Sequence, residues 1–158
     1  MATITATLAN THGSSSRGRQ PYYVQQIVDL TANSIAPGDV VQCLTVPANT
    51  KIIAAGLQVT SSATMNTGTN ATATLGTDAD ADEYVTAFDI DGASDGAYAP
   101  SVTVSADLVI TSANTLDLTL AGSGASFTAG KIRVYAVLQD VSDIGEMEAD
   151  EVGRDQLA

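Results

Sequence analysis

The chain of 158 residues has the length of a single domain. Its formal net charge of -12 and sequence pI of about 4.1 disfavour binding to nucleic acids or anionic membranes. Its one cysteine, Cys43, excludes an intrachain disulfide, and few aromatic residues (4%) with many Thr and 13 Gly favour an all-β fold over a helical one.

Residues 1–20 predict a flexible N-terminal arm, or an extended segment that orders only on a partner. From residue 9 the segment is polar and rich in Gly and Ser, and it carries Arg17 and Arg19 but no acidic residue. Such segments order on a partner. The start, MATITATLANTHG, has neither the basic nor the apolar region of a secretion signal, so we expect folding in a reducing cytosol.

Residues 21–140 predict a single antiparallel β-sandwich, jelly-roll-like and of about eight strands. The first strand, YYVQQIVDL, has one face formed by Tyr22, Val24, Val28 and Leu30, with Gln26 as the exception. The next strands are DVVQCLTV and KIIAAGLQVTSSA, and the intervening residues 47–50 predict a hairpin connection between them.

The later strands follow at the spacing of a sandwich. NATATLGT and YVTAFDI flank an acidic loop, and SVTVSADLVI contains one or two short strands. TLDLTL alternates strictly, which predicts its leucines inward and Asp117 outward. The last strand, KIRVYAVLQDV, has an apolar face formed by Ile132, Val134, Ala136 and Leu138.

Residues 141–158 predict an acidic C-terminal tail. Gly145 and Gly153 interrupt it, and it has no repeated apolar face. We therefore expect a solvated or partner-dependent extension.

No motif in the chain supports catalysis. The single histidine, His12, lies in the arm, where it has no rigid setting as a general base. No nucleotide-binding loop and no paired-cysteine metal motif occurs. Cys43 lies within an apolar strand and is expected to be a small buried thiol. The sequence thus predicts a protein that is not an enzyme and needs no cofactor.

The acidic stretch TDADADEYVTAFDIDG at residues 77–92 raises the question of a calcium site. Counted from Asp78, positions 6 and 12 of an EF-hand loop hold Glu83 and Asp89, where the motif needs Gly and Glu. A different calcium site formed by Asp78, Asp80, Asp82 and Asp89 stays open as an alternative. We expect a solvated connection between strands with no metal bound.

The runs GDVVQCLTVPANTKIIAAGLQVTSSA, ATLGTDADADEYVTAFDI and KIRVYAVLQDV together resemble small structural proteins of tailed bacteriophages, described as capsid decoration or cement proteins. The resemblance covers residues 21–141 and leaves out the arm and the tail. It implies a β-rich protein without catalytic residues, placed on the outer capsid surface of a virion assembled in the bacterial cytoplasm.

The resemblance also implies a partner, the major capsid protein, and a homo-oligomer, with a trimer favoured. We expect Arg17, Arg19, Tyr22 and Tyr23 to bind the partner, because the arginines can pair with acidic residues of the capsid or of a second subunit. Two alternatives stay open: a calcium-assisted carbohydrate-binding or adhesion module, and a head- or tail-fibre component.

Overall fold

The computed structural model describes residues 20–32, 35–99 and 109–141, and within these ranges it holds eight β-strands and no α-helix. The strands are β1 (Tyr22–Asp29), β2 (Val40–Val46), β3 (Thr50–Met65), β4 (Thr72–Gly76), β5 (Val85–Asp89), β6 (Val109–Ile110), β7 (Asn114–Ala121) and β8 (Phe127–Asp140). The prediction of an all-β fold is confirmed.

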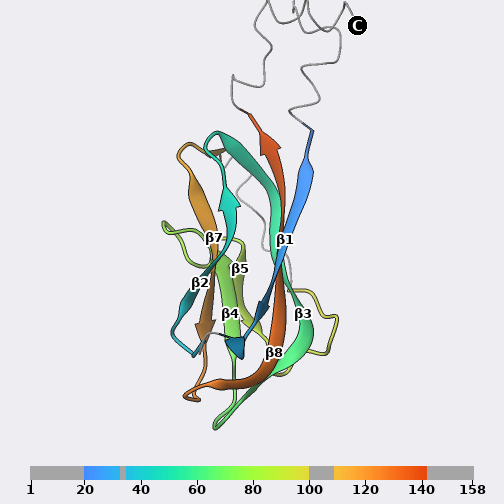
Figure 1. Cartoon of the computed structure of the whole chain (residues 1–158), viewed down its shortest axis with the longest axis vertical. Coiled ribbons are helices and arrows are strands. Elements are labelled where there is room, and N and C mark those ends of the chain that lie inside the picture. The colour runs from blue at the N-terminus through green and yellow to red at the C-terminus, as the bar shows by residue number, and fades with distance from the viewer. Residues whose placement is uncertain (1–19, 33–34, 100–108, 142–158) are drawn as a thin grey trace, which may run out of the picture.

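The strands form two antiparallel sheets that face each other (Figure 1). Sheet A has the order β1-β8-β3-β6, and sheet B has the order β2-β7-β4-β5. Consecutive strands alternate between the sheets except at β4 and β5, which are neighbours in sheet B. This order is that of a jelly roll, so the predicted β-sandwich is also confirmed.

The longest pairing joins β3 and β8 in the middle of sheet A, where Thr50 is paired with Asp140 and Met65 with Phe127. β1 covers the other edge of β8, and Tyr22 is paired with Leu138. The start of β1 and the end of β8 therefore lie side by side at one end of the sandwich (Figure 1).

The core lies between the sheets and is made of aliphatic side chains. The predicted inward face of the last strand is confirmed, because Ile132, Val134, Ala136 and Leu138 are all buried. From sheet B, Leu116, Leu118 and Leu120 of β7 are buried against them. Alternation at a period of two explains both sets, since one face of each strand must leave water.

One prediction about the connections is wrong. Residues 47–50 do not form a hairpin, because β2 pairs with β7 in sheet B whereas β3 belongs to sheet A. The turn instead crosses from one sheet to the other, with Asn49 at a positive φ of 56°. Of the predicted strands in residues 101–110, only β6 lies within the described residues, and residues 100–108 lie outside them.

The core predicts the effect of a charge on β8. Val134→Asp would place an unpaired carboxylate at a fully buried position, and we expect it to lower the free energy of unfolding by more than about 3 kcal/mol. Val40→Asp on β2 introduces the same charge at a side chain that is 57% exposed, and should change stability by less than about 1 kcal/mol. Chemical denaturation of both variants measures the difference, and equal losses would contradict the assigned inward face.

Candidate partner-binding face

The outward face of sheet A gathers tyrosines and cations. The buried side chains of β8 alternate with Arg133, Tyr135 and Val137, which therefore point away from the core. In the β1–β8 pairing, Tyr23 lies opposite Val137 and Ile27 opposite Arg133. Paired residues share a face of the sheet, so these β1 side chains point outward as well.

Three tyrosine rings form one cluster across this face. The rings of Tyr23 and Tyr135 are stacked with their centroids 6.1 Å apart, and Tyr98 meets Tyr135 edge-on at 5.9 Å. Burial, with the neighbouring Tyr98 and Tyr23, raises the pKa of Tyr135 above its ordinary value. Tyr23 and Tyr98 remain 55% and 58% exposed, so the two outer rings are accessible to a partner.

Gly56 gives the central ring its place. It is the direct partner of Tyr135 in the β3–β8 ladder. A Cβ atom at this position would lie 2.5 Å from the Tyr135 hydroxyl oxygen and 2.8 Å from Cζ. The ring therefore lies over the backbone of β3 and extends toward Tyr98. Tyr98 itself forms an isolated β-bridge with Gln58 of β3.

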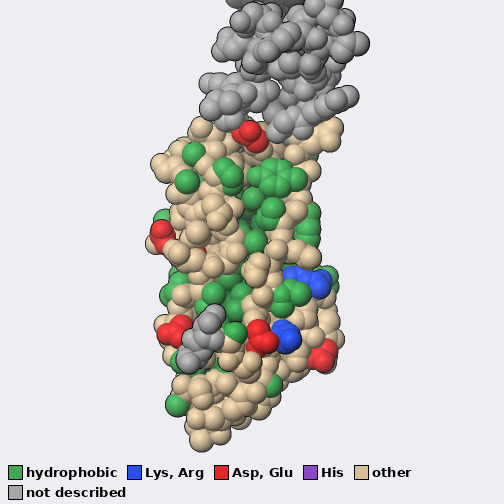
Figure 2. Space-filling view, in the orientation of Figure 1, with side chains coloured by type: hydrophobic (Ala, Val, Ile, Leu, Met, Phe, Trp, Pro, Cys, Tyr) green, Lys and Arg blue, Asp and Glu red, His purple; other side chains and the backbone are tan. Residues whose placement is uncertain are grey.

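Every Lys and Arg in the described residues, namely Lys51, Lys131 and Arg133, lies on this same face. Arg133 Nη1 donates to the Gln58 side-chain oxygen at 2.8 Å, and Gln58 Nε2 donates to the Gly96 carbonyl at 3.2 Å. In Figure 2 the Lys and Arg side chains lie over the part of the surface that sheet A forms. We call Tyr23, Tyr98, Tyr135, Lys51 and Arg133 the tyrosine face.

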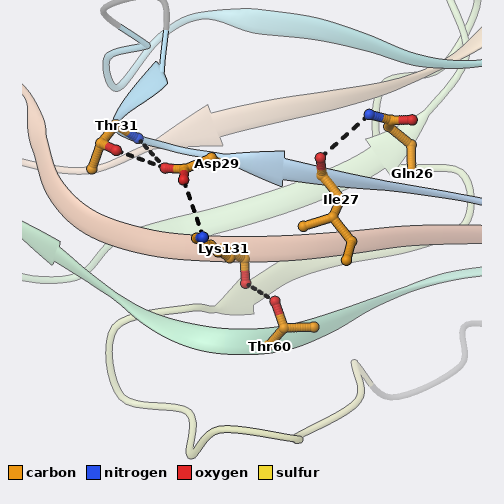
Figure 3. A network of polar contacts seen from close by, with 6 residues as sticks. All are labelled: Gln26, Ile27, Asp29, Thr31, Thr60 and Lys131. Carbon is orange, nitrogen blue, oxygen red and sulfur yellow. Dashed lines mark hydrogen bonds and ion pairs between the residues drawn. The ribbon is translucent and has the colours of Figure 1, made fainter.

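Lys131 is tied to β1 by an ion pair at the lower end of this face. Its Nζ lies 3.4 Å from Asp29 Oδ2 (Figure 3). The other carboxylate oxygen of Asp29 accepts hydrogen bonds from the Thr31 hydroxyl at 2.7 Å and the Thr31 backbone N–H at 3.0 Å. The Thr31 hydrogen bonds and then Lys131 hold the pKa of Asp29 below its ordinary value.

The structure describes two of the four residues predicted to bind a partner, Tyr22 and Tyr23. Tyr23 belongs to the tyrosine face, whereas Tyr22 is on the opposite side of β1 and is 40% exposed at the end of the strand. Arg17 and Arg19 lie outside the described residues. The role of all four in binding stays a prediction.

Sequence reasoning missed Tyr135 and Tyr98. Tyr135 alternates with the four buried residues of the last strand, so the pattern that identified the core also places this ring outward. No comparable signal exists for Tyr98, since its position depends on the backbone bonds that residues 96–99 make to Leu57 and Val59 of β3.

The acidic stretch between β4 and β5 lies on sheet B. Asp78, Asp80 and Asp82 are exposed, and the neighbouring Asp80 raises the pKa of Asp82. Burial raises the pKa of Glu83, with Asp80 as a second cause. No group of three or more His, Cys, Asp or Glu side chains within residues 20–32, 35–99 and 109–141 is placed to hold a metal ion.

Asp117 lies on the outward face of β7, as predicted, but it has little contact with solvent. It is only 6% exposed, and Oδ1 has no hydrogen-bond partner among the described residues. Asp117 is paired with Gly76 in the β4–β7 ladder, and a Cβ at Gly76 would collide with the backbone of Asp80 and Ala81. The acidic connection thus folds over this part of sheet B and covers a side chain that alternation alone places in solvent.

Cys43 is half-buried on β2, less enclosed than predicted. Burial raises the pKa of its thiol to about 11, so the thiol is protonated at neutral pH and is a poor nucleophile.

No helix in the described residues has the length and apolar character needed to cross a membrane.

Comparison with solved structures shows the same fold in chains of three phage capsids. A chain of the cyanophage Pam1 capsid asymmetric unit is 19% identical, with a TM-score of 0.59 over 87% of this chain and 93% of that one. A chain of the Ralstonia phage GP4 capsid is 17% identical, with a TM-score of 0.58 over 78% and 86%.

A third similar chain comes from the acidic stable capsid of Helicobacter pylori bacteriophage KHP30. It is 12% identical, with a TM-score of 0.55 over 77% of this chain and 89% of that chain. No family model and no curated protein sequence matches the chain. At these identities the likeness establishes the fold.

The Gly56–Tyr135 contact predicts a change in titration. Gly56→Ala would push the Tyr135 ring off β3, because the added Cβ occupies the place of its hydroxyl end. Since burial is the first cause of the raised pKa, we expect the pKa of Tyr135 to fall toward its ordinary value. Ultraviolet difference titration measures this, with Thr45→Ala, an exposed position on β2 of the other sheet, as the control. An unchanged Tyr135 pKa would show that the ring does not depend on this glycine.

Two aspartates of the acidic stretch should change the unfolding temperature in opposite directions when their charge is removed. Asp82→Asn should raise the unfolding temperature at pH 7, because a folded-state pKa above the unfolded value means that the charged form is disfavoured by folding. Asp89→Asn should lower it, because hydrogen bonds from the Gly92 and Asp91 backbone lower the pKa of Asp89. The Asp82 effect should be lost as the pH falls through its raised folded-state pKa to the unfolded value of about 3.9, whereas the Asp89 effect should persist to lower pH, until its lowered folded-state pKa is reached. Thermal melts at pH 7 and pH 3 test both, and a shared sign would contradict the assignment.

Proposed function

We propose that this chain is a non-enzymatic structural protein of a bacteriophage virion, which decorates and stabilises the outer capsid surface by binding the major capsid protein. The observation that carries the proposal is the tyrosine face, where accessible aromatic rings and the described cations share one side of a highly acidic protein. The fold shared with chains of three phage capsids supports a structural role in the virion.

The chemistry of the tyrosine face suits a protein partner. Tyr and Arg are enriched at the centres of protein interfaces, since they combine a large contact area with a polar group that can be satisfied. Tyr135 is held from below by Gly56, and Arg133 is held by Gln58, so both are ordered before binding. A face with fixed side chains loses less conformational entropy when it binds.

The charges of the sandwich give the complex an orientation. The tyrosine face would meet an acidic or neutral surface of the capsid, and the exposed acids of the β4–β5 connection on sheet B would remain in solvent. In this arrangement the arm with Arg17 and Arg19 and a homo-oligomer, a trimer favoured, would add further contacts around the site.

A second candidate function, carbohydrate binding in adhesion, is favoured by one observation. Tyr23 and Tyr98 present exposed rings beside the polar groups of Gln58 and Arg133, and flat rings with adjacent hydrogen-bonding groups suit sugar ligands. The chain has no Trp, which weakens this candidate.

Capsid binding can be measured with capsids of the parent phage prepared without this protein. We expect Tyr23→Ala and Tyr98→Ala each to weaken binding by about 30-fold, the loss typical of an aromatic residue at the centre of an interface. Val40→Ala removes an equally exposed apolar side chain from β2 and should leave binding unchanged. Lys51→Glu should weaken binding and reduce its dependence on salt.

Sedimentation of labelled protein with capsids gives the affinities. Equal binding by all four variants and the wild type would overturn the proposal that the tyrosine face is the contact. If the wild type binds an array of bacterial-surface glycans and the two tyrosine variants lose that binding but still bind capsids, the second candidate would be favoured.

A further inference from the structure

The edge strands β1 and β2 form an unprotected side of the sandwich. They are the outer strands of sheet A and sheet B on the same side, and Figure 2 shows hydrophobic side chains along the middle of the view that contains them. No charged residue and no proline occurs in β1 before Asp29 or anywhere in β2. Natural edge strands usually carry such residues to prevent pairing with another chain.

The free edge of β1 presents backbone groups of alternate residues. The Leu30 N–H donates to the Gly130 carbonyl at 3.0 Å, so Leu30 faces β8, and this alternation continues along an antiparallel pair. The residues that turn their N–H and C=O away from β8 are therefore Tyr23, Gln25 and Ile27. In agreement, the Ile27 carbonyl points away from β8 and accepts only a long bond of 3.4 Å from the Gln26 side chain (Figure 3).

Beside this edge lies a groove of about 330 Å³ between β1 and β2. Its apolar lining includes Ile27, Val28, Ile35, Val41 and Cys43. Gln26 occupies the one inward position of β1 that carries a polar side chain, and it is exposed at the groove. A strand added to β1 would place its own inward side chains over this lining.

We propose that residues 3–8 of a neighbouring copy, TITATL, add as a strand to the free edge of β1. In this segment Ile4, Ala6 and Leu8 alternate with Thr3, Thr5 and Thr7, and no residue is charged. Ile4 and Leu8 enter the groove, and the threonines face outward. Main-chain hydrogen bonds to Tyr23, Gln25 and Ile27 supply the pairing. This contact between copies does not depend on the capsid role.

Charge favours the arm as the occupant, and length favours a second copy as its source. Residues 1–20 carry Arg17 and Arg19 and no acid, which gives the arm a net charge of +2. Since the whole chain has a net charge of -12, the other 138 residues have a net charge of -14. The segment is thus the part of one copy that the rest of another attracts. Return to its own β1 would need residues 9–21 as a loop, far longer than the 2–5 residues of most hairpins. When fully extended, these 13 residues can span about 43 Å between residues 3–8 of one copy and the sandwich that they leave.

Hydrogen exchange followed by NMR tests the proposal on full-length chains. The acceptor is isotope-labelled Ile4→Asp/Leu8→Asp, which keeps the groove but has an arm that cannot enter it. Alone, its amides of Tyr23, Gln25 and Ile27 should exchange freely, while those of Val24 and Val28, bonded to β8, stay protected. An excess of unlabelled wild type should slow the three edge amides by at least about tenfold.

Matched donors make the result specific. Unlabelled Thr5→Asp/Thr7→Asp carries the same added charge on the outward side and should still protect the acceptor, whereas unlabelled Ile4→Asp/Leu8→Asp should not. Protection of labelled wild type that cannot be transferred to the acceptor would show that the arm folds onto its own chain, and would overturn the proposal. Free exchange of the edge amides in every sample would overturn it as well.

Discussion

The pairing of β3 with β8 is the constraint on which the rest of the sandwich depends. These are the two longest strands, of 16 and 14 residues, and they hold the centre of sheet A with β1 on one flank. A shift of one residue in their register would turn the apolar face of β8 to solvent. The fit of Tyr135 over Gly56 opposes such a shift, because any other partner on β3 would offer a side chain in place of open backbone.

The sequence predicts the core well because the core obeys a simple period. Strict alternation in β7 and β8 identifies the buried leucines and valines, and the strand count follows from the spacing of the turns. The connections are harder, since Pro47–Thr50 has the composition of a hairpin, and only the partners of β2 and β3 reveal that the chain crosses between sheets. The residue types in a turn indicate that the chain turns there, but they do not indicate which sheet the next strand joins.

Asp117 and Tyr98 show why the candidate site was only partly predictable. The sequence places Asp117 outward, and it does point outward, but the β4–β5 connection lies over that region of sheet B. Tyr98 is far from Tyr23 and Tyr135 in the chain and joins them only because residues 96–99 run beside β3. Contacts between a loop and a sheet leave no periodic signal. Tyr23 could be named in advance, whereas its neighbours required the three-dimensional arrangement.

The cations of the tyrosine face and the acids above sheet B lie on opposite outer surfaces of the sandwich. Facing sheets pack about 10 Å apart, and their outward side chains are farther apart still. Acidic side chains also lie on the sheet A side, since Asp29 pairs with Lys131 and Asp95 accepts hydrogen bonds from Ser62 of β3. Lys51 and Arg133 are therefore local positive groups on a protein whose total charge is strongly negative.

The neighbouring positions of Tyr22 and Leu138 have a practical consequence for protein engineering. Chain entry into β1 and chain exit from β8 occur at the same pole, while the turns that follow Met65 and precede Phe127 lie at the other (Figure 1). A peptide joined directly before residue 21 and a second one joined directly after residue 141 would both leave the sandwich at this pole. The turns at the opposite pole would stay free for insertions.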